Sequence, residues 1–322
     1  MTLLDEKIEK AKTICILGHK NPDGDCIGSS LAIYNYILNK YSDKTARVYL
    51  SPFSDKFLLL PNADKISNDT NDAIKYDLAI IVDSGSLDRL DEFQMYFKDA
   101  KDSILFDHHE DNTFPAQMSI VNPKSIATCE ILYQYLDKEF LDKNVAMCLY
   151  TGLATDSGIF RYKATTRNTL ELAGKLIQYG FDFSDLLDKI VFECTLNQRK
   201  AQGIAFSRIK ILSKGKVSFS YLLDEDLDQL SLTRNDIDNV VVYLREMTDI
   251  QIAAFAYQVG NQTFKFSVRG KNEKYNLSEF AKSHEGGGHI LAAGLLYHGN
   301  INDIIKKFEE DITEFIEEKD RN

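Results

Sequence analysis

Short runs of four or five apolar residues recur along the first third of the chain, and polar residues follow each of them. The clearest runs are residues 13–17, 78–82 and 103–106, which are rich in Ile, Leu and Val. Runs of this length and composition are typical of strands that are buried on both faces of a parallel sheet. Residues 46–50 and 118–121 have a similar pattern, so five strands are predicted in this part of the chain.

Apolar residues at helical spacing lie between and after these strands. The predicted helices cover residues 26–39, 126–140, 144–155 and 166–179. Strands that alternate with helices indicate an α/β fold with a parallel sheet. We therefore expect an N-terminal parallel-sheet domain with helices on both of its faces.

The pattern changes in the second half of the chain. Residues 186–210 have helical character and no clear strand. The elements predicted after them are a strand at 216–222, a helix at 236–247, a hairpin at 250–270 that turns at Gly260-Asn261, and helices at 278–283 and 301–318. The expected organisation is an N-terminal domain (1–185), a helical connection (186–210) and a smaller α+β domain (211–322).

Carboxylate and imidazole side chains follow three of the predicted strands. They are His19, Asp23 and Asp25 after the first strand, Asp83 after the second, and Asp107, His108 and His109 after the third. In parallel sheets, ligands bind beyond the carboxyl ends of the strands, so these side chains are expected at one common site. A cluster of this composition predicts a metal site with a catalytic role.

Two of these motifs also have a purely structural alternative. Asp25 could cap the helix that starts at residue 26, although this would leave His19 and Asp23 unexplained. Asp83 on its own could equally be a helix cap or a ligand. Side chains alternate in direction along a strand, so His108 and His109 should point differently, one toward a metal and the other toward substrate.

The predicted ligands outnumber what one ion needs. Carboxylate and imidazole ligands suit magnesium, manganese, iron or zinc. Two ions about 3.5–4 Å apart, bridged by one carboxylate and a water, would use the whole set. Such a pair activates water and stabilises charge on a phosphoryl oxygen, which indicates hydrolysis of a phosphoester.

Composition limits the partners of this site. The formal net charge is −11 and the pI is near 5.1, which argues against a long nucleic-acid duplex as substrate and leaves a small phosphorylated molecule. No apolar run approaches the ~20 residues of a membrane helix, and residues 1–12 lack a signal-peptide pattern, so a cytoplasmic protein is expected. Five scattered cysteines without a C-x-x-C pair argue against disulfides and a thiolate zinc site.

Five motifs in order resemble those of the DHH phosphoesterase superfamily. The matching segments are His19 to Ser29, Asp83, Asp107-His108-His109, Ala154 to Gly158, and Gly286-Gly287-Gly288-His289 with the following Ala292-Ala293-Gly294. The last of these is similar to the signature of the DHH-associated C-terminal domain. Within the superfamily, the chain is most similar to the NanoRNase/pAp phosphatase branch, which includes stand-alone phosphodiesterases of cyclic-dinucleotide breakdown.

The resemblance implies a role for each matching residue. His19, Asp23 and Asp83 would hold one divalent ion, while Asp25, Asp83, His108 and Asp156 would hold a second, with Asp83 bridging the two. The ions are expected to be Mn²⁺, with Mg²⁺ as the alternative. His109 would act on the scissile phosphate as proton donor or charge stabiliser, and Asp107 would orient a histidine. Asp156 is identified through the resemblance alone.

The same comparison places substrate binding in the C-terminal domain. Arg269 would bind a terminal phosphate, and Gly286, Gly287 and Gly288 would let backbone N–H groups approach an anion, beside His289. The structural alternatives are a solvated strand end for Arg269 and a plain turn for the glycines. Two departures from the family pattern are Gly270, where serine is usual, and Glu285, where a fourth glycine is common.

The expected function is therefore hydrolysis of short nucleotides. Expected substrates are pApA, short oligoribonucleotides, pAp and cyclic di-AMP, and the resemblance also implies a homodimer. A RecJ-like single-strand exonuclease is an alternative that the acidic charge disfavours. A non-catalytic nucleotide-binding sensor is a second alternative, although such a protein would be expected to have lost metal ligands.

Overall fold

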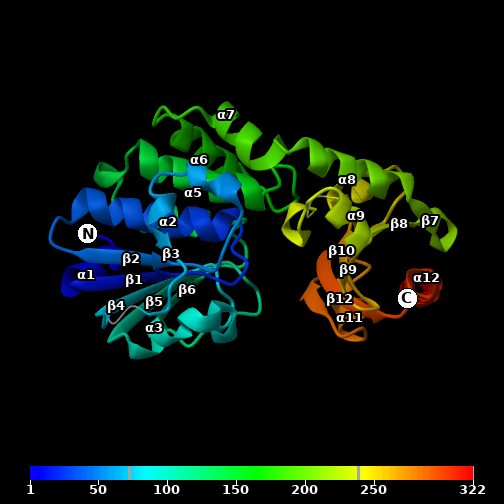
Figure 1. The fold of residues 1–322 in the computed structure, drawn as a ribbon. Helices are drawn as coiled ribbons and strands as arrows, with labels where there is room; N and C mark the ends of the chain where they lie inside the picture. The colour runs from blue at the N-terminus through cyan, green and yellow to red at the C-terminus, as the bar shows by residue number, and fades with distance from the viewer. Residues whose placement is uncertain (72–73, 238–239, 322) are drawn as a thin grey trace. The chain divides into compact units, whose positions relative to one another are not determined.

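The chain forms two compact units in the computed structural model, Met1–Glu193 and Cys194–Asn322 (Figure 1). The structure describes residues 1–71, 74–237 and 240–321. None of the described helices combines the length and the apolar character that a membrane span needs. The predicted connection of residues 186–210 contributes to both units, since α7 (Phe183–Leu187) belongs to the first and α8 (Leu196–Ser207) to the second.

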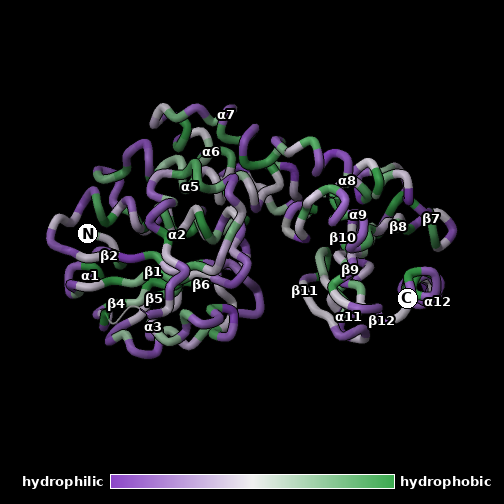
Figure 2. The backbone as a smooth tube through the Cα atoms, in the orientation of Figure 1, coloured by the Kyte–Doolittle hydropathy of each residue, from purple (hydrophilic) through white to green (hydrophobic). Residues whose placement is uncertain are grey.

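The first unit is built on a parallel sheet of six strands. They are β1 (Thr13–Leu17), β2 (Thr45–Tyr49), β3 (Ile66–Ser67), β4 (Leu78–Val82), β5 (Asp102–Asp107) and β6 (Met118–Val121), in the order β3-β2-β1-β4-β5-β6. Every neighbouring pair is parallel. The five predicted strands are confirmed, and β3 was not predicted because two residues are too short to form a pattern. The central strands are hydrophobic along their length, as their complete burial requires (Figure 2).

Helices pack on both faces of this sheet, as predicted. The helices of this unit, besides α7, are α1 (Leu3–Lys10), α2 (Gly24–Lys40), α3 (Gln94–Asp99), α4 (Thr128–Gln134), α5 (Lys143–Asp156) and α6 (Arg167–Ile177). On β1, Ile14 and Ile16 face the core under α2, α4 and α5, whereas Cys15 and Leu17 face the side of α3. The helix predicted at 126–140 is shorter than expected, because α4 ends at Gln134.

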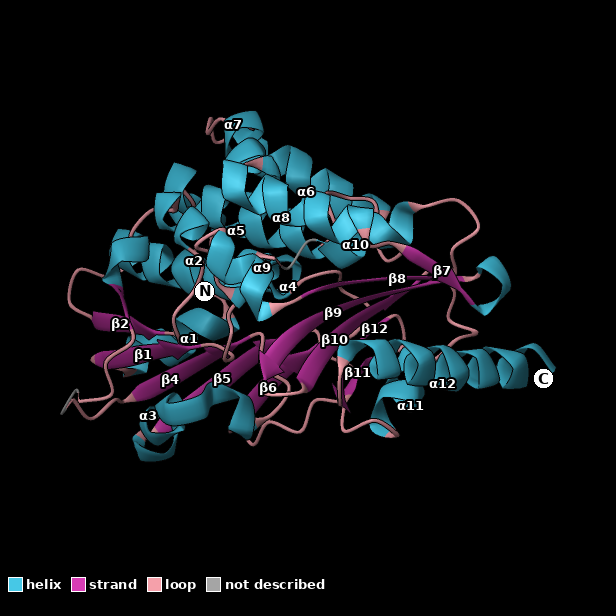
Figure 3. Cartoon of the chain, turned by 45° about the vertical axis from the view of Figure 1, so that its right-hand side comes forward, coloured by secondary structure: helices cyan, strands magenta, loops and turns pink. Residues whose placement is uncertain are grey.

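The second unit contains a mixed sheet in the order β11-β12-β10-β9-β8-β7 (Figure 3). Its elements after α8 are β7 (Lys210–Leu212), β8 (Val217–Leu222), α9 (Asp224–Gln229), α10 (Val240–Glu246), β9 (Ile252–Gly260), β10 (Thr263–Gly270), α11 (Leu277–Lys282), β11 (Gly287–His289), β12 (Ala292–His298) and α12 (Ile301–Arg321). α8, α9 and α10 pack on one face of the sheet, and α11 and α12 pack on the other.

The predicted hairpin at 250–270 is confirmed as β9 and β10, with a turn that includes Gln262 at a φ of 55°. The strands β7, β11 and β12 were not predicted, and β11, which consists of two glycines and a histidine, carries no apolar alternation. Part of the helix predicted at 236–247 falls on residues 238–239, which lie outside the described residues, and α10 forms the remainder.

A buried carboxylate ties the N-terminal helix to the first unit. Asp5 is fully buried and accepts hydrogen bonds from the hydroxyls of Tyr36 (2.7 Å) and Tyr41 (2.8 Å) and from Nζ of Lys40 (2.9 Å). Burial raises the pKa of Asp5, but the hydrogen bonds from Thr2, Lys40 and the two tyrosines outweigh it and hold this pKa far below its usual range. The carboxylate is therefore fully satisfied and charged.

Replacement of Asp5 should destabilise the first unit without touching the predicted site. We expect Asp5→Ala to lower the free energy of unfolding by about 3 kcal/mol, because it leaves the hydroxyls of Tyr36 and Tyr41 without their acceptor and removes one of the two carboxylates that Lys40 contacts. Urea unfolding followed by circular dichroism measures this change. Glu6→Ala, an exposed neighbour on the same helix, should change the free energy by no more than about 0.5 kcal/mol, and an equal effect of both variants would contradict the prediction.

Candidate metal centre

The three predicted strand ends lie side by side in the first unit. β1, β4 and β5 are adjacent and parallel in the sheet, so their carboxyl ends share one edge. Asp83 directly follows β4, and Asp107 is the last residue of β5. The sheet therefore delivers the predicted carboxylates and imidazoles to one place.

Asp83 is at the middle of this cluster. Its Oδ2 atom lies 3.4 Å from Nε2 of His19, and its Oδ1 atom lies 3.5 Å from Nε2 of His108. Nε2 of His19 is also 3.8 Å from Oδ2 of Asp23, and Nε2 of His108 is 3.3 Å from Oδ2 of Asp156. The two oxygens of Asp83 thus face two different sets of ligand-type side chains.

Asp23 and Asp25 are positioned by helix N-termini. Oδ1 of Asp23 accepts the backbone N–H groups of Asp25 and Cys26, each at 3.1 Å, so Asp23 is the N-cap of α2. Asp25 instead accepts the N–H groups of Thr128 (2.6 Å) and Cys129 (3.0 Å) at the start of α4. The cap considered for Asp25 therefore exists, but on a different helix, and it fixes this carboxylate beside His108.

The backbone at the end of β4 aims Asp83 into the cluster. Asp83 has a φ of 55°, in the left-handed region that Asp tolerates better than most residues, and its N–H still donates to the carbonyl of Phe106 at 2.9 Å. The hydroxyl of Thr128 donates to Oδ1 of Asp83 at 3.2 Å. The start of α4 therefore holds both Asp25 and Asp83, and sequence patterns did not identify Thr128.

A close contact between α2 and α5 brings Asp156 to the site. A β-carbon on Gly28 would lie 2.5 Å from the carbonyl oxygen of Cys148, and one on Gly152 would lie 2.5 Å from Oδ1 of Asp25. Glycine at these two positions lets the helix backbones approach each other. Asp156, the last residue of α5, then joins Asp25 and His108 in a group whose ligand atoms all lie within 4.8 Å of one another.

His109 and Asp107 form a pair beside the cluster. Nδ1 of His109 donates to Oδ1 of Asp107 at 2.7 Å, and it lies 3.8 Å from Oδ1 of Asp83. Asn112 donates its side-chain amide to the other oxygen of the fully buried Asp107. Burial lowers the pKa of His109, but the hydrogen bond to Asp107 and the charge of Asp83 outweigh it and raise this pKa. The Asp107 carboxylate therefore orients His109 and favours its protonated form.

The histidine geometry shows that the cluster fits a cation. Nδ1 of His19 lies 2.8 Å from the carbonyl oxygen of Lys20, and Nδ1 of His108 lies 3.3 Å from that of Ser125. A carbonyl oxygen only accepts, so each Nδ1 carries a proton, and each Nε2 points toward carboxylate oxygens. At 3.3–3.8 Å this arrangement needs a positive charge, either a proton on Nε2 or a metal ion between the two groups. The donor set therefore suits divalent metal ions.

The pKa values of the cluster show the same excess of negative charge. Burial and the charge of Asp83 raise the pKa of Asp25 to about 7, and burial with neighbouring carboxylates raises the pKa of Asp156 well above its ordinary value. Burial lowers the pKa of His19, but the hydrogen bonds to Asp23 and Asp83 raise it to about 10. In the absence of metal, protons compensate the carboxylates.

Cys26 is a further group in the cluster. Its Sγ atom lies within 4.8 Å of ligand atoms of His19 and Asp83. Burial and the charge of Asp83 raise the pKa of this thiol well above its ordinary value, so it stays protonated in the metal-free protein. All five cysteines are free thiols, as the sequence predicted.

The predicted substrate-binding residues lie on the sheet of the second unit. Arg269 on β10 pairs with Ala292 on β12, and Ala292 pairs with His289 on β11. Directly paired residues project from the same face of a sheet, so Arg269 and His289 share one face, with one strand between them. His289 is exposed and Arg269 is half-buried.

The three predicted glycines have different surroundings. A β-carbon on Gly286 would lie 2.1 Å from the carbonyl oxygen of Gly294, and one on Gly288 would lie 2.5 Å from that of Ala292. The pairing of β11 with β12 therefore requires glycine at 286 and 288. Gly287 meets nothing within 4 Å at its β-carbon position, so its backbone is open to a ligand.

The two departures from the family pattern lie away from Arg269. Oε2 of Glu285 is 3.6 Å from Nε2 of His298, at the far end of β12 from Ala292, so this carboxylate points away from the predicted phosphate site. A β-carbon on Gly270 would contact Leu277 and Leu291 at 3.4 Å, on the opposite side of the strand from Arg269.

The cluster predicts a pH-dependent stabilisation by metal. In metal-free protein, Asp25 with a pKa of about 7 holds a proton that the unfolded chain, with a carboxyl pKa of about 3.9, releases. The free energy of unfolding should therefore fall as pH rises from about 4 to 7, and His19 should extend this fall toward pH 10. Added Mn²⁺ replaces these protons, so it should raise the unfolding temperature by several degrees at pH 8 and little at pH 5.5.

Thermal unfolding with and without EDTA at the two pH values measures this difference. Asp83→Ala should remove the rise in unfolding temperature that Mn²⁺ causes at both pH values. A rise of the same size at pH 5.5 and pH 8 would contradict the replacement of protons on Asp25 and His19 by metal.

Thr128 is predicted to position Asp83. Thr128→Val keeps the backbone N–H that Asp25 accepts and removes only the hydroxyl that donates to Asp83. We expect a 10–100-fold loss of metal affinity, which is typical when a partner of a metal ligand is removed. Titration calorimetry with Mn²⁺ measures it, and Thr151→Val is the control, because that buried hydroxyl donates within its own helix. Equal affinities in the two variants would exclude this role.

Family models match both units of the chain. Residues 13–153 match the DHH family, N-terminal domain, and residues 214–315 match the DHHA1 domain. A solved structure of an exopolyphosphatase-related protein from Bacteroides fragilis superimposes with a TM-score of 0.92 at 23% identity, covering 98% of this chain and 96% of that chain. This similarity establishes the fold.

Two relatives share most of the chain's length. One is the probable bifunctional oligoribonuclease and PAP phosphatase NrnA of Streptococcus mutans, 29% identical over 89% of this chain and 90% of that protein. The other is the bifunctional oligoribonuclease and PAP phosphatase NrnA of Bacillus subtilis, 28% identical over 91% and 92%. With both domain models matched in order and relatives of this kind along nearly its whole length, the chain has a DHH domain followed by a DHHA1 domain.

Proposed function

We propose that this protein is a two-metal phosphoesterase that hydrolyses short nucleotides. Its substrates would be pApA and short oligoribonucleotides cut to mononucleotides, pAp converted to AMP, and cyclic di-AMP. The coarser part of this function, hydrolysis of phosphoester bonds, is that of the DHH phosphoesterases, whose two domains the chain contains. The named activities of the two relatives support the choice of substrates.

The environment of Asp83 gives this proposal its strongest support. Oδ2 of Asp83 faces His19, which also contacts Asp23, and Oδ1 faces His108, which also contacts Asp156. This division supports one ion held by His19, Asp23 and Asp83, and a second held by Asp25, Asp83, His108 and Asp156. Each oxygen of the shared carboxylate would then serve one ion.

The mixture of ligands favours manganese. Carboxylates alone suit Mg²⁺, while imidazoles suit later transition metals, so four carboxylates with two imidazoles suit Mn²⁺. Two such ions, when bound, supply Lewis acidity for a phosphoryl oxygen and lower the pKa of the attacking water.

The remaining polar residues would bind the substrate and donate a proton. His109, held by Asp107 and favoured in its protonated form, is suited to donate a proton to the leaving oxygen or to stabilise charge on the phosphate. In the second unit, Arg269 and His289 would bind another phosphate, and the bare backbone at Gly287 would lie against the nucleotide. The homodimer implied by the family resemblance stays a prediction.

Turnover of a substrate panel tests this proposal. We expect Mn²⁺-dependent release of AMP from pApA, short oligoribonucleotides or pAp, and loss of this activity in EDTA. Asp83→Ala should lower kcat by about 10³-fold or more, because it removes the shared ligand and several kcal/mol of charge stabilisation. The Asp83→Ala variant should still fold, because removing this carboxylate lowers the repulsion among the carboxylates of the metal-free site.

Asp88→Ala, which changes a carboxylate outside the cluster, is the matched control and should keep wild-type activity. Near-wild-type activity of Asp83→Ala would exclude the bridging role. Nucleotide binding without any turnover on the whole panel would favour a sensor instead, and a preference for long single strands would favour a RecJ-like exonuclease.

A further inference from the structure

One face of the sheet in the second unit is only partly covered by helices. α8, α9 and α10 pack on β8 and β9 through residues such as Ala253 and Phe255. On β10 this face carries Lys265, Ser267 and Arg269, because the residues that alternate with them pack into the core on the side of α12. Lys265 is exposed, and Ser267 and Arg269 are partly exposed. α10 also approaches β10, but these side chains keep exposed surface, so the part of the face formed by β10, β12 and β11 is accessible to a ligand.

The floor of this accessible part has almost no side chains. Next to the row that contains Arg269 and His289 runs a second row of paired residues, Ser267, Gly294 and Gly287. A serine and two glycines leave the backbone bare between Arg269 and Lys265. A flat floor of this kind lets a ribose or a base lie against the strands.

Lys265 lies over this floor. Its Cε atom is 4.0 Å from the position that a β-carbon on Gly294 would occupy. Gly294 is paired with Ser267, whereas Lys265 is paired with Leu296, so the Lys265 side chain leans along the sheet toward Arg269. Among the residues that the structure describes, none forms a hydrogen bond or an ion pair with the Lys265 ammonium group. An uncompensated positive charge is thus held over an open backbone floor.

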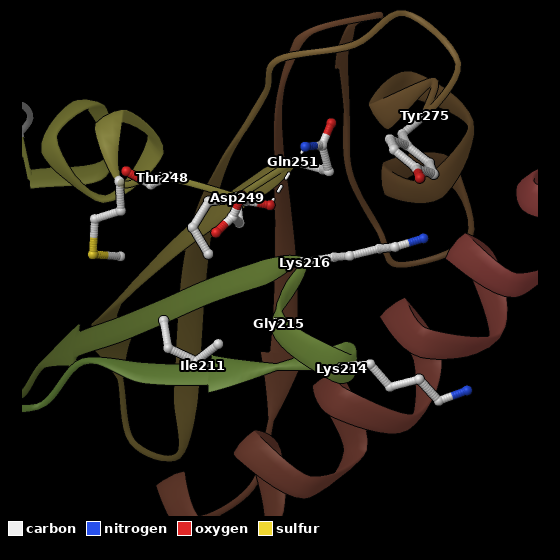
Figure 4. A pocket seen from close by; sticks show the side chains of 10 residues that line it. Ile211, Lys214, Gly215, Lys216, Thr248, Asp249, Gln251 and Tyr275 are labelled. Atoms are coloured by element: carbon white, nitrogen blue, oxygen red, sulfur yellow. Dashed lines mark hydrogen bonds between the residues drawn. The ribbon is translucent and has the colours of Figure 1, made fainter.

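The lysines around another hollow of this unit differ from Lys265 in this respect. That hollow is lined by residues that include Lys214, Lys216 and Tyr275 (Figure 4). Lys214 pairs with Glu317 at 2.9 Å and Lys216 pairs with Asp320 at 2.5 Å, both on α12. Their charges are compensated within the protein, so the hollow offers an anion little attraction.

We propose that Lys265 binds a second phosphate of an oligonucleotide, beyond the one at Arg269, and so favours chains of several nucleotides over a mononucleotide. The proposal rests on the proposed function, because it uses the same substrate class. Lys265 and Arg269 are four residues apart on one strand, about 13 Å between their Cα atoms. Nη1 of Arg269 donates to the carbonyl of Val268 at 3.0 Å, which holds the guanidinium near its own end of the strand. In this assignment the guanidinium, tied to its own end of the strand, and the ammonium of Lys265 contact different phosphates.

Kinetics on two substrates test this assignment. Lys265→Met keeps the length of the side chain and removes its charge. We expect kcat/KM for a pentaadenylate to fall about tenfold through a higher KM, while kcat/KM for pAp stays within twofold. The slope of log KM against log salt concentration for the pentaadenylate should also fall by about 0.7, as for one lost phosphate contact to a single strand.

The matched control is Lys306→Met, which removes an exposed lysine from α12 on the other face of the sheet. It should behave as wild type with both substrates. In Lys265→Met, an equal loss of kcat/KM on pAp and on pentaadenylate, or no loss on either substrate, would overturn the proposal.

A binding measurement separates this inference from the proposed function. If the wild-type protein hydrolysed no nucleotide, the proposed function would fail, and fluorescence anisotropy with labelled pentaadenylate in EDTA would still test Lys265. Weaker binding in Lys265→Met than in Lys306→Met would support the second phosphate site. Equal affinity of the two variants would refute it.

Discussion

Repulsion among buried carboxylates is the constraint on which the first unit depends. Asp25, Asp83 and Asp156 converge where little water screens them, and their pKa values are shifted accordingly for Asp25 and Asp156. Each is held in place by a different part of the backbone: two N–H groups of α4 for Asp25, a left-handed residue after β4 for Asp83, and the close α2–α5 contact for Asp156. The backbone therefore holds these carboxylates together before any ion binds, and a bound cation offsets the repulsion among them.

The backbone also decides which histidine atoms face the ions. Carbonyl groups of Lys20 and Ser125 accept from Nδ1 of His19 and His108, so both rings present Nε2 to the carboxylates. His109 also donates from Nδ1, but to the carboxylate of Asp107 instead of a backbone carbonyl. Neighbouring histidines of one motif thus acquire different chemistry from their hydrogen-bond partners, which supports ligation by His108 and proton donation by His109.

Sequence patterns could predict the part of this site that depends on strand ends. The carboxyl ends of parallel strands lie at one edge of a sheet, so the apolar runs predicted that residues 19 to 25, Asp83 and residues 107 to 109 lie together. Asp156 ends a helix and has no local pattern, so only family resemblance pointed to it. Thr128 and Cys26 were missed because their contacts depend on how α2 and α4 pack. β11 and β12 were missed because the glycine strand β11 has no apolar alternation and is recognised only by its pairing with β12. The same pairing explains why glycine is needed at 286 and 288.

The distribution of charge in the second unit argues for short substrates. A protein with a net charge of −11 can hold a polyanion only where positive charges are collected locally. The lysines around the hollow beside α12 are neutralised by its acidic residues, whereas Lys265 on the open face forms no ion pair with a described residue and lies about 13 Å from Arg269 between their Cα atoms. Two cations on one strand can match only a few phosphates. Among the described residues of β10, β11 and β12 on this face, Lys265 and Arg269 are the only lysine and arginine, so the charge pattern that admits a short oligonucleotide also limits its length.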